Sequence, residues 1–435
     1  MKLLHIGMKP FSMGQTFKRK RASIFCENDL NDISKLQALV LPIGGQQSYG
    51  EICLPPEEGV ALSMEQAWSA IRVSDEEKTV TVDANIRIGE LVDFLEDNGY
   101  FLPVVPGTPD ATVGGCIAAD VHGKSSHKYG SFGHHINTIQ LYNKVDGLAW
   151  IRSGSKVMSK TIGGFGVTGI ILRAVLRIEK LPGNAIRVIT HRFDNLLTCV
   201  SSMIERTAQH EDLAIWFSVQ KKKLYAKLVC GDWCWTKKSL SSKNQFPGIK
   251  AIFFKLAGLG FISRLSYSFL ARLIYFTPTN STMSSRIANF PLHYMPGWSR
   301  LFGVSFIERQ FLVEENQLKE FIPKLIELLR KHKVYSPLCA IKIFNTNGLG
   351  QMSFVKRGIS FNILYRSESQ DFSNELSTLL IEFSCREYLA KSRVGHTTFP
   401  MGYEASNEWI LEAGRSGVES EMIKSIRATF SGSGS

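Results

Sequence analysis

The residues most able to do chemistry concentrate in a glycine-dense stretch at 106–133, PGTPDATVGGCIAADVHGKSSHKYGSFG. Gly114 and Gly115, followed by small side chains, allow the backbone to approach a bulky planar or phosphorylated ligand, because glycine has no Cβ. Successive N–H groups in such turns form a concavity that binds anions. A similar piece, PIGGQQSYG, stands upstream at 42–50. These loops predict a large anionic cofactor held by the backbone of the N-terminal half.

The histidines of this region invite a metal interpretation. His122 and His127 are five residues apart and His134 adjoins His135, but only Asp120 stands near enough in sequence to add a further ligand. Bound transition metals need three or four convergent ligands, so we expect no metal site. For His122 alone, the residues leave open whether it is a structural or an active-site histidine.

A second glycine motif, GFGVTG at 164–169, matches the GxGxxG signature of dinucleotide-binding folds. That signature works only between a strand and a helix whose N-terminus faces the pyrophosphate. Here a strand-like run follows the motif and no clear strand precedes it. We therefore expect no Rossmann site.

Charge and cysteine content limit the possible partners and compartment. Lys and Arg number 51 against 39 Asp and Glu, a net charge of +12. This balance favours a negatively charged partner, or only a solvated basic surface. The basic clusters lack the interleaved aromatics on which nucleic-acid bases stack, so no nucleic-acid partner is expected. The eight cysteines lack zinc-site spacing, and the N-terminus lacks a secretory signal pattern. Together they predict reduced thiols in a cytoplasmic protein.

Hydrophobic periodicity predicts an α+β protein in two parts. The first part carries a strand at 80–85, a helix at 88–98 and a buried strand at 170–178. The Leu-Pro-Gly break at 181–183 marks a boundary. Strands are predicted beyond it at 224–230, 305–313, 340–344 and 359–365, and helices at 318–329 and 372–383.

The most apolar and aromatic segment is 246–276, FPGIKAIFFKLAGLGFISRLSYSFLARLIYF. Lys255, Arg264 and Arg272 interrupt it, and cations are costly inside a bilayer, so it is not expected to span a membrane. Apolar bulk with basic edges suits an element that lies in the membrane interface. A buried helical hairpin broken at Gly258 and Gly260 explains the same pattern.

With these motifs in place, the chain resembles the vanillyl-alcohol-oxidase (p-cresol methylhydroxylase) flavoprotein superfamily. The N-terminal match lies in PIGGQQSYG, in 106–139 and in GGFGVTGIILRAVLRI at 163–178, in the family's order. Within the superfamily the resemblance is nearest to the decaprenylphosphoryl-β-D-ribose oxidase branch. It continues more thinly through AIWF (214–217), PGWSRLFG (296–303), FIERQFLV (306–313), IKIF (341–344) and YLAKSR (388–393).

The resemblance implies a two-subdomain FAD-binding domain of the PCMH type and a substrate domain. We expect the FAD domain at 1–180 and the substrate domain, an antiparallel sheet flanked by helices, at 181–385. A C-terminal return to the FAD domain is expected at 386–430. The final Ser-Gly-Ser-Gly-Ser at 431–435 is taken for an appended tail outside the fold.

The resemblance also assigns FAD as cofactor, carried by glycines and small polar residues of the three loops. The implied cofactor-binding residues are Gly44, Gly45, Ser48, Tyr49, Pro106, Gly107, Thr112, Gly114, Gly115, Ala118, His122, Gly123, Lys124, Ser131, Gly133, Gly164, Gly169 and Ile170. Some members attach FAD to a histidine at the position of Gln47. Glutamine cannot form that bond, so we predict non-covalent FAD.

For catalysis the resemblance points to Lys391 as the residue nearest the reacting hydroxyl, with Tyr388 and His122 beside it. A lysine there acts as base only with a lowered pKa, and otherwise orients and polarises. The implied substrate-binding residues are Lys342, Gln310, Trp216, Arg300 and Asn362. Without the resemblance, Lys342 would be taken for an exposed strand residue.

The expected function is FAD-dependent oxidation of a sugar hydroxyl to a ketone, on a polyprenyl-phosphate-linked pentose, as the oxidase half of an epimerisation. An NADH-dependent keto-reductase would complete the epimer. We expect a cytoplasmic protein peripheral to the bacterial inner membrane, in contact through 246–276. The alternatives are a soluble alditol or aldonolactone oxidase of the same superfamily, and a non-catalytic flavin- or lipid-binding accessory protein.

Overall fold

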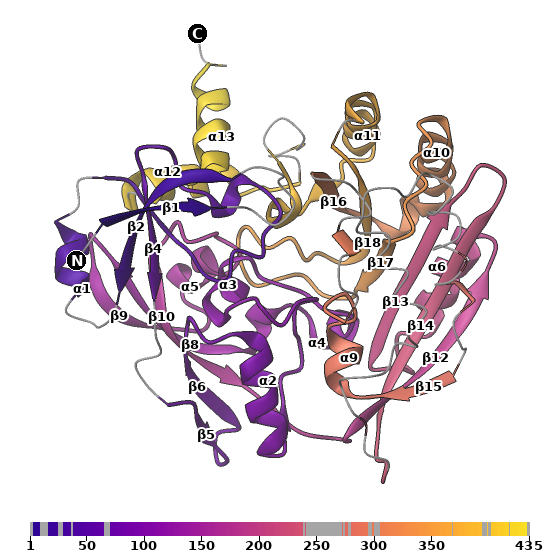
Figure 1. The fold of residues 1–435 in the computed structure, drawn as a ribbon, viewed down its shortest axis with the longest axis horizontal. Helices are drawn as coiled ribbons and strands as arrows, with labels where there is room; N and C mark the ends of the chain where they lie inside the picture. The colour runs from indigo at the N-terminus through magenta and orange to yellow at the C-terminus, as the bar shows by residue number, and fades with distance from the viewer. Residues whose placement is uncertain are drawn as a thin grey trace.

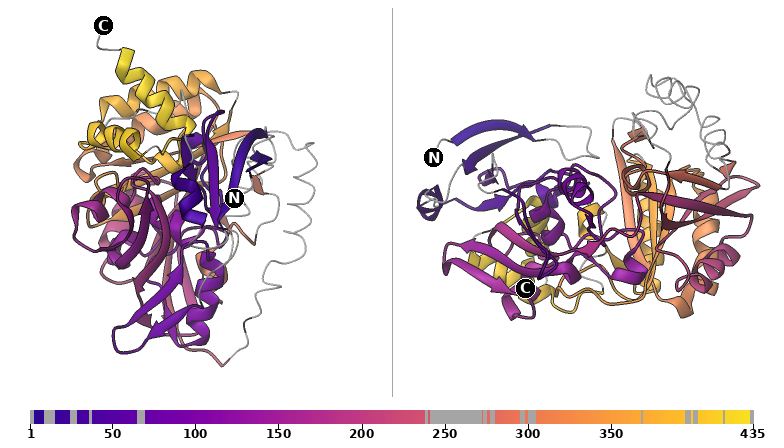
Figure 2. Two further views of the ribbon diagram at one scale, coloured as in Figure 1. Left: turned by 90° about the vertical axis from the view of Figure 1, so that its left-hand side faces the viewer. Right: turned by 90° about the horizontal axis from the view of Figure 1, so that it is seen from below.

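The structure is a computed structural model of the 435-residue chain. It describes residues 3–8, 16–24, 29–35, 38–64, 70–237, 240, 272, 275–276, 280–294, 298–299, 305–367, 369–393, 398, 402–416 and 418–432. The described chain forms two halves side by side, with the C-terminal helices on the N-terminal half (Figure 1; Figure 2, right). Helices and sheets occur in both halves, which confirms the predicted α+β class.

The N-terminal half contains two sheets. The first has the order β1-β2-β4-β3, formed by β1 (Leu3–Met8), β2 (Phe17–Ile24), β3 (Val40–Pro42) and β4 (Val60–Met64), with α1 (Asp29–Ser34) and η1 (Glu51–Cys53). Its apolar side chains pack against Ile170 and Leu172 of the second sheet. The FAD-side loop at 43–50 follows β3 directly.

The second sheet has the order β5-β6-β10-β8-β9 and is antiparallel throughout. Its strands are β5 (Arg72–Ser74), β6 (Thr79–Asp83), β8 (Ile136–Asn143), β9 (Gly147–Arg152) and β10 (Ile170–Arg177). Its helices are α2 (Ile88–Asp97), α3 (Val113–Ala118), α4 (Ser126–Tyr129), η2 (Phe132–His135) and α5 (Lys156–Thr161). A short ladder of β7 (Tyr100–Phe101) with β11 (Glu179–Lys180) ends this half. The GxGxxG motif lies between α5 and β10, with no strand before it, as the sequence indicated.

The second half is built on an antiparallel eight-stranded sheet of order β15-β12-β14-β13-β17-β18-β16-β19. Its strands are β12 (Ala185–Phe193), β13 (Asp212–Val219), β14 (Leu224–Cys234), β15 (Asn280–Met283), β16 (Phe306–Val313), β17 (Cys339–Phe344), β18 (Gly358–Arg366) and β19 (Arg386–Glu387). Helices α6 (Leu196–Glu205), α10 (Leu318–Lys331) and α11 (Gln370–Glu382) cover one face (Figure 1). The turn η4 (Glu315–Gln317) precedes α10, and α9 (Ser285–Asn289) lies toward the first half.

Strand alternation divides the residues of this sheet between its two faces. Ile215, Ile341, Phe361 and Phe311 point into the core beneath the helices. Their strand neighbours of opposite parity face the N-terminal half. The second face is therefore free to carry polar side chains toward a site between the halves.

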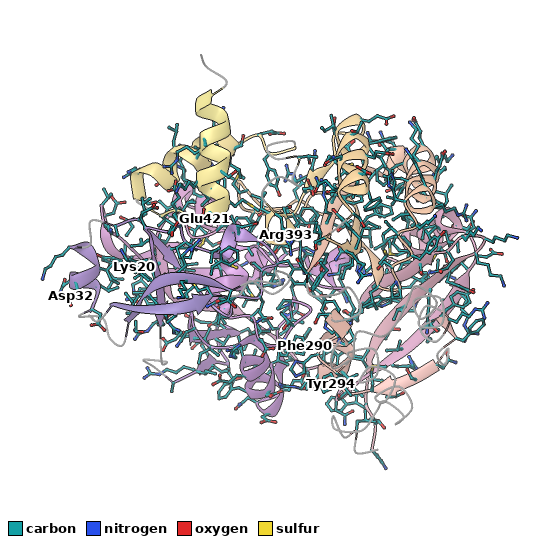
Figure 3. The ribbon with its side chains drawn as sticks, turned by 45° about the horizontal axis from the view of Figure 1, so that its top comes forward. Lys20, Asp32, Phe290, Tyr294, Arg393 and Glu421 are labelled. Atoms are coloured by element: carbon teal, nitrogen blue, oxygen red, sulfur yellow. The ribbon has the colours of Figure 1, made fainter. Side chains whose placement is uncertain are left out.

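The C-terminal segment joins the two halves. β19 pairs with β16, and η5 (Leu389–Lys391) follows it. The helices α12 (Ser406–Ser416) and α13 (Glu421–Gly432) then lie on the N-terminal half. Arg19 forms an ion pair of 2.9 Å with Glu421 at the start of α13, and Figure 3 shows Glu421 above strand β2 and Arg393 between the halves. Helix α13 continues two residues into the segment expected to be a tail.

The sequence predicts neither a membrane-spanning segment nor a metal site, and the described residues bear on both predictions. Among the described residues, no helix has the length and apolar content needed to cross a membrane. The same residues contain no group of three or more His, Cys, Asp or Glu side chains able to hold a metal ion. The segment 246–276 lies almost wholly outside the described residues.

Candidate functional site

A cavity of about 610 Å³ runs between the two halves. Ligand sites commonly have volumes of roughly 300–1,000 Å³ and occur where domains meet. At one end the walls are Leu41, Leu62 and Ile170 of the N-terminal sheets. At the other end they are Lys342 and Lys391 of the second half and the C-terminal return. The lining of this one cavity contains residues from all three glycine loops, so one ligand can contact all of them.

The loop after β3 provides a backbone site for an anion. Within the described chain, the N–H groups of residues 44–48 donate to no protein acceptor, and Gln46 has a positive φ of 53°. Successive free N–H groups around a left-handed residue form an anion-binding concavity. Gly45 packs so closely on the next loop that a Cβ there would lie 2.1 Å from the carbonyl oxygen of Asp110. The loop therefore keeps this shape only with glycine.

Helix α3 brings its glycine pair against the cavity. Thr112 caps the helix by accepting a hydrogen bond from Gly115 N, and Gly114 N donates to Ala84 O at 2.8 Å. A Cβ on Gly114 would lie 3.0 Å from that of Ala84, so the glycine lets α3 pack directly on the end of β6. Gly107 has open space where a Cβ would stand. Small residues thus clear the wall for a bulky ligand.

Most of the residues predicted for the cofactor line this cavity, but three do not. Those in its wall are Gly44, Gly45, Ser48, Tyr49, Pro106, Gly107, Thr112, Gly114, Gly115, Ala118, His122, Gly123, Lys124, Gly169 and Ile170. Ser131, Gly133 and Gly164 lie outside it. Gly133 N instead donates to the buried Asp120 at 2.9 Å, and Ser131 contacts His134. Gly164 O accepts from Trp409 of α12 at 2.9 Å. These three hold the loops in place from behind.

The cavity also contains polar atoms that no protein group satisfies. His122 Nδ1 and Asn85 Oδ1 are buried side-chain atoms without a hydrogen-bond partner in the described chain, and both residues line the wall. Buried polar atoms are normally paired, so these two fit a ligand that carries donors and acceptors. The free N–H groups at one end, the cleared wall at α3 and these two atoms suit an FAD molecule.

At the far end of the cavity, sheet register gathers a polar cluster. Gln310 lies opposite Asn362 across the β16–β18 ladder, and Asn362 lies opposite Ala340 of β17. Trp216 of β13 faces the same Ala340 from the other side. Lys342 follows two residues along β17, on the same face. The substrate residues predicted from sequence thus share one wall, except Arg300, which lies outside the described residues.

Lys391 reaches this wall from η5 and pairs with a carboxylate that sequence reasoning missed. Its Nζ lies 3.3 Å from Glu308 Oε2, and the Glu308 side chain is only 5% exposed. Asn362 Nδ2 donates to the other carboxylate oxygen at 2.7 Å. The Nζ also lies 3.4 Å from the centroid of the Tyr49 ring. Burial lowers the pKa of Lys391, and Glu308 opposes that shift.

The pKa values of two neighbouring groups depart from their ordinary range. Burial, with Lys391 and Lys124 nearby, lowers the pKa of Lys342 to about 8. Burial, and secondarily Glu308, raises the pKa of the Tyr49 phenol well above its usual value. Lys342 thus changes charge within about one pH unit of neutral pH.

His122 and Tyr388 both face the cavity but are engaged by other groups. His122 Nε2 lies 2.6 Å from Gln310 Nε2, so the ring nitrogen accepts from the amide. Burial, Lys342 and Lys391 lower the pKa of His122 well below its usual value, which keeps the ring neutral. The Tyr388 hydroxyl donates to Ala119 O at 3.0 Å, and burial raises its pKa. The lone pair of His122 Nε2 and the hydroxyl hydrogen of Tyr388 are therefore already used in hydrogen bonds to the protein.

Comparison with known proteins bears on this geometry. The FAD binding domain family matches residues 29–151. The decaprenylphosphoryl-β-D-ribose oxidase of Mycolicibacterium smegmatis is 29% identical over 361 residues, 77% of this chain and 76% of that protein. The alditol oxidase of a Streptomyces species is 25% identical over 149 residues, 34% and 35% of the two chains. A mitochondrial D-lactate dehydrogenase [cytochrome] of Arabidopsis thaliana is 26% identical over 166 residues, 36% and 29%.

Fold, cavity and these likenesses define an enzyme class, that of FAD-dependent oxidoreductases acting on CH–OH groups. The chain resembles the vanillyl-alcohol-oxidase (p-cresol methylhydroxylase) flavoprotein superfamily, its residues 29–151 match an FAD binding domain, and FAD is its cofactor. Within that superfamily it is similar to decaprenylphosphoryl-β-D-ribose oxidase over three quarters of both chains.

Proposed function

We propose that this flavoenzyme oxidises a hydroxyl of a polyprenyl-phosphate-linked pentose to a ketone, as the oxidase half of an epimerisation. The observation that carries the proposal is the far end of the cavity, where cationic side chains and an aromatic wall meet. Oxidised FAD in the cradle would supply the hydride acceptor. The chain's own residues would bind, orient and deprotonate the substrate.

The cations suit an anionic group on the substrate. Lys342, Lys391 and Lys124 all line the cavity. Lys391 is paired with Glu308, and Lys124 Nζ donates to Ala288 O. Lys342 has no hydrogen-bond partner among the described residues, so its ammonium is available to a phosphate oxygen. A phosphate held there would place the attached sugar between Lys342 and Lys391.

The aromatic wall suits an apolar tail. Phe101 lies 5.4 Å from Trp233, centroid to centroid, and Trp233 is paired with Ile186 across β12 and β14. Pro291 and Leu292, just after α9, complete this part of the lining. Figure 3 shows Phe290 and Tyr294, which flank these two residues, low between the halves. Burying an isoprenoid unit here would contribute roughly 25 cal/mol for each Å² removed from water.

A lipid-linked substrate would also explain the basic composition and the apolar segment at 246–276. Basic residues near an anionic leaflet contribute about 1 kcal/mol each to membrane binding. We propose a cytoplasmic location peripheral to the bacterial inner membrane, with contact through 246–276. We further propose that an NADH-dependent keto-reductase consumes the ketone. A deletion of 250–275 that leaves membrane association unchanged would exclude the contact.

The decisive experiment follows the visible flavin spectrum of the FAD-reconstituted protein without oxygen. Decaprenylphosphoryl-β-D-ribose in detergent is expected to bleach the oxidised flavin bands within seconds, with one ketone formed per flavin. Rapid bleaching by a free alditol or aldonolactone, with none by the lipid-linked ribose, would establish the soluble oxidase instead. If no alcohol reduces the flavin and Lys391→Ala preserves all cellular function, the protein is a non-catalytic accessory.

A further inference from the structure

We propose that Glu308, rather than Lys391, accepts the hydroxyl proton of the alcohol that this flavoenzyme oxidises. The inference rests on the CH–OH oxidation of the proposed function but not on the identity of the sugar. It follows from where β16 places this one carboxylate.

Glu308 is the acidic side chain that the sheet directs into the substrate end of the cavity. Arg309, the next residue, points to the opposite face, and Gln310 returns to the cavity beside His122. Glu211 and Asp212, the other carboxylates of this half in the wall, lie at the start of β13, where Glu211 contacts Lys128 and Tyr129 of α4 and Asp212 interacts electrostatically with Lys124. Among the residues that the structure describes, Glu308 is therefore the carboxylate beside the predicted position of the sugar.

The partners of Glu308 fix its position. Asn362 holds Oε1 at 2.7 Å and Lys391 holds Oε2 at 3.3 Å. Tyr49 adds a side-chain hydrogen bond from the loop after β3. The two oxygens together offer about four lone-pair positions, and these three donors leave one of them for a substrate hydroxyl. Groups fixed in this way need little reorganisation when a substrate binds.

Lys391 is the weaker candidate because of this pairing. To accept a proton, its amine must first be neutral, which would leave Glu308 without its ion-pair partner in a nearly buried place. Removing one partner of a buried pair is costly, whereas proton uptake by the carboxylate needs no prior deprotonation. Lys391 then serves as a donor that positions the reacting hydroxyl.

The His122 ring is excluded on similar grounds, because its Nε2 already accepts from Gln310. Lys342, the remaining titratable group on this wall, faces the proposed phosphate. The charged and titratable groups around Glu308 include Lys391 from η5, Tyr49 from the loop after β3, Lys342 and Cys339 from β17, Tyr388 just before η5 and His122 from the loop after α3.

The step balances as follows. The C–H bond of the carbinol carbon would break, and its electron pair would leave as hydride to the oxidised FAD held in the cradle. The O–H bond breaks, its proton passes to a Glu308 oxygen, and its electron pair forms the second bond of the C=O group. Glu308 would then be neutral, and the positive charge of Lys391 would be balanced by the negative charge that bound FAD would gain on reduction.

The test uses the FAD-loaded full chain and any alcohol that reduces the wild-type flavin, so failure of the lipid-linked ribose as substrate is a separate result. Glu308→Gln keeps the volume and is expected to slow anaerobic flavin reduction about 10²- to 10⁴-fold. FAD stoichiometry and melting temperature check its fold. Glu308→Asp should retain part of the rate, and Glu320→Gln on the exposed face of α10 should retain all of it.

Two readouts separate proton acceptance from a structural role. Formate added to Glu308→Ala should restore reduction in proportion to formate concentration, whereas amines should not restore it. In wild type, the infrared difference spectrum on substrate reduction should gain a carboxylic-acid C=O band that glutamate labelling with ¹³C shifts. The proposal is overturned if Glu308→Gln reduces within threefold of wild type, if the labelled band is missing, or if only Lys391→Ala is rescued, and only by amines.

Discussion

Arg309 and Glu387 form a bidentate ion pair on the side of β16 opposite the cavity, with both nitrogen–oxygen distances at 2.7 Å. Both side chains are almost fully buried. Arg309 also donates to Ser377 of α11, and Glu387 accepts from Thr398 N and Oγ1. The pair therefore joins β16, α11 and the C-terminal return, and it fixes the strand that carries Glu308 and Gln310.

Removing one member of this pair should destabilise the protein strongly. Arg309→Met leaves Glu387 buried without its counter-ion, which we expect to cost about 3–5 kcal/mol of unfolding free energy. Urea unfolding of the FAD-loaded protein measures the change. In the double variant Arg309→Met/Glu387→Gln no charge is left unpaired, so it should recover a good part of the loss. A double variant as unstable as the sum of the two single ones would contradict this account.

Gly45 should control flavin affinity through the shape of its loop. A Cβ at this position meets the Asp110 backbone at 2.1 Å, so Gly45→Ala must displace one of the two loops that form the cradle. We expect the FAD dissociation constant to rise at least about tenfold, or ~1.4 kcal/mol, as measured by flavin fluorescence. Gly414→Ala in α12, where a Cβ meets nothing within 4 Å, is the matched control.

FAD should leave the denatured protein completely. Gln47 Nε2 donates to Gly45 O at 2.8 Å, and an amide cannot form the bond that histidine makes to flavin in some relatives. Acid precipitation followed by the supernatant spectrum measures the released fraction. Flavin that stays with the pellet, and with a tryptic peptide, would show another attachment point.

His135 should make the fold sensitive to acid. Burial lowers its pKa from 6.5 to about 4, although Nε2 bonds to Tyr129 O. The unfolded chain binds this proton below pH 6.5 and the folded chain only near pH 4, so stability falls as the pH drops between these values. At pH 5 the loss is ~2 kcal/mol. In His135→Gln, the free energy of unfolding measured in urea should fall less between pH 7 and pH 5 than in wild type. An equally large fall in the variant would refute the assignment to His135.

Glycine patterns and strand periodicity predict much of the fold because they report local geometry. The strand at 170–178 and the helix at 318–329 come from side-chain alternation that each segment carries by itself, and β10 and α10 lie there. The glycine loops show where backbone can approach a ligand. They do not show which side of the loop the ligand takes, so the pattern places Ser131 and Gly133 at the ligand although they bond to His134 and Asp120, respectively.

Glu308 could not be found in the same way. It lies in the strand FIERQFLV, next to Arg309, without spacing that marks a site, and its partner Lys391 is 83 positions away. Only the register of β16 against β18 and the return of the chain through η5 bring the two together. The one available signal is parity, because Gln310, two residues on, shares its face of the strand.

Lys342 should set the affinity for an anionic substrate and its dependence on pH. Because its pKa lies at about 8, the ammonium is charged below that pH and neutral above it. We expect KM for a polyprenyl-phosphoryl sugar to rise as the pH passes 8, with kcat changed little. In Lys342→Gln, KM should be raised at every pH, and its further rise above pH 8 should disappear. Lys342→Arg should keep a low KM above pH 8, because arginine stays charged.

The matched control is Lys324→Gln, which removes an exposed lysine of α10 bonded to Glu320. Steady-state kinetics between pH 6 and 9.5, with a free alditol as the uncharged comparison substrate, separate phosphate binding from a general loss of activity. An anion contact predicts that Lys342→Gln weakens only the phosphorylated substrate, because an uncharged alcohol gains nothing from the ammonium. Equal losses for both substrates would mean that Lys342 supports the sugar or the wall, and the phosphate would then have to bind elsewhere.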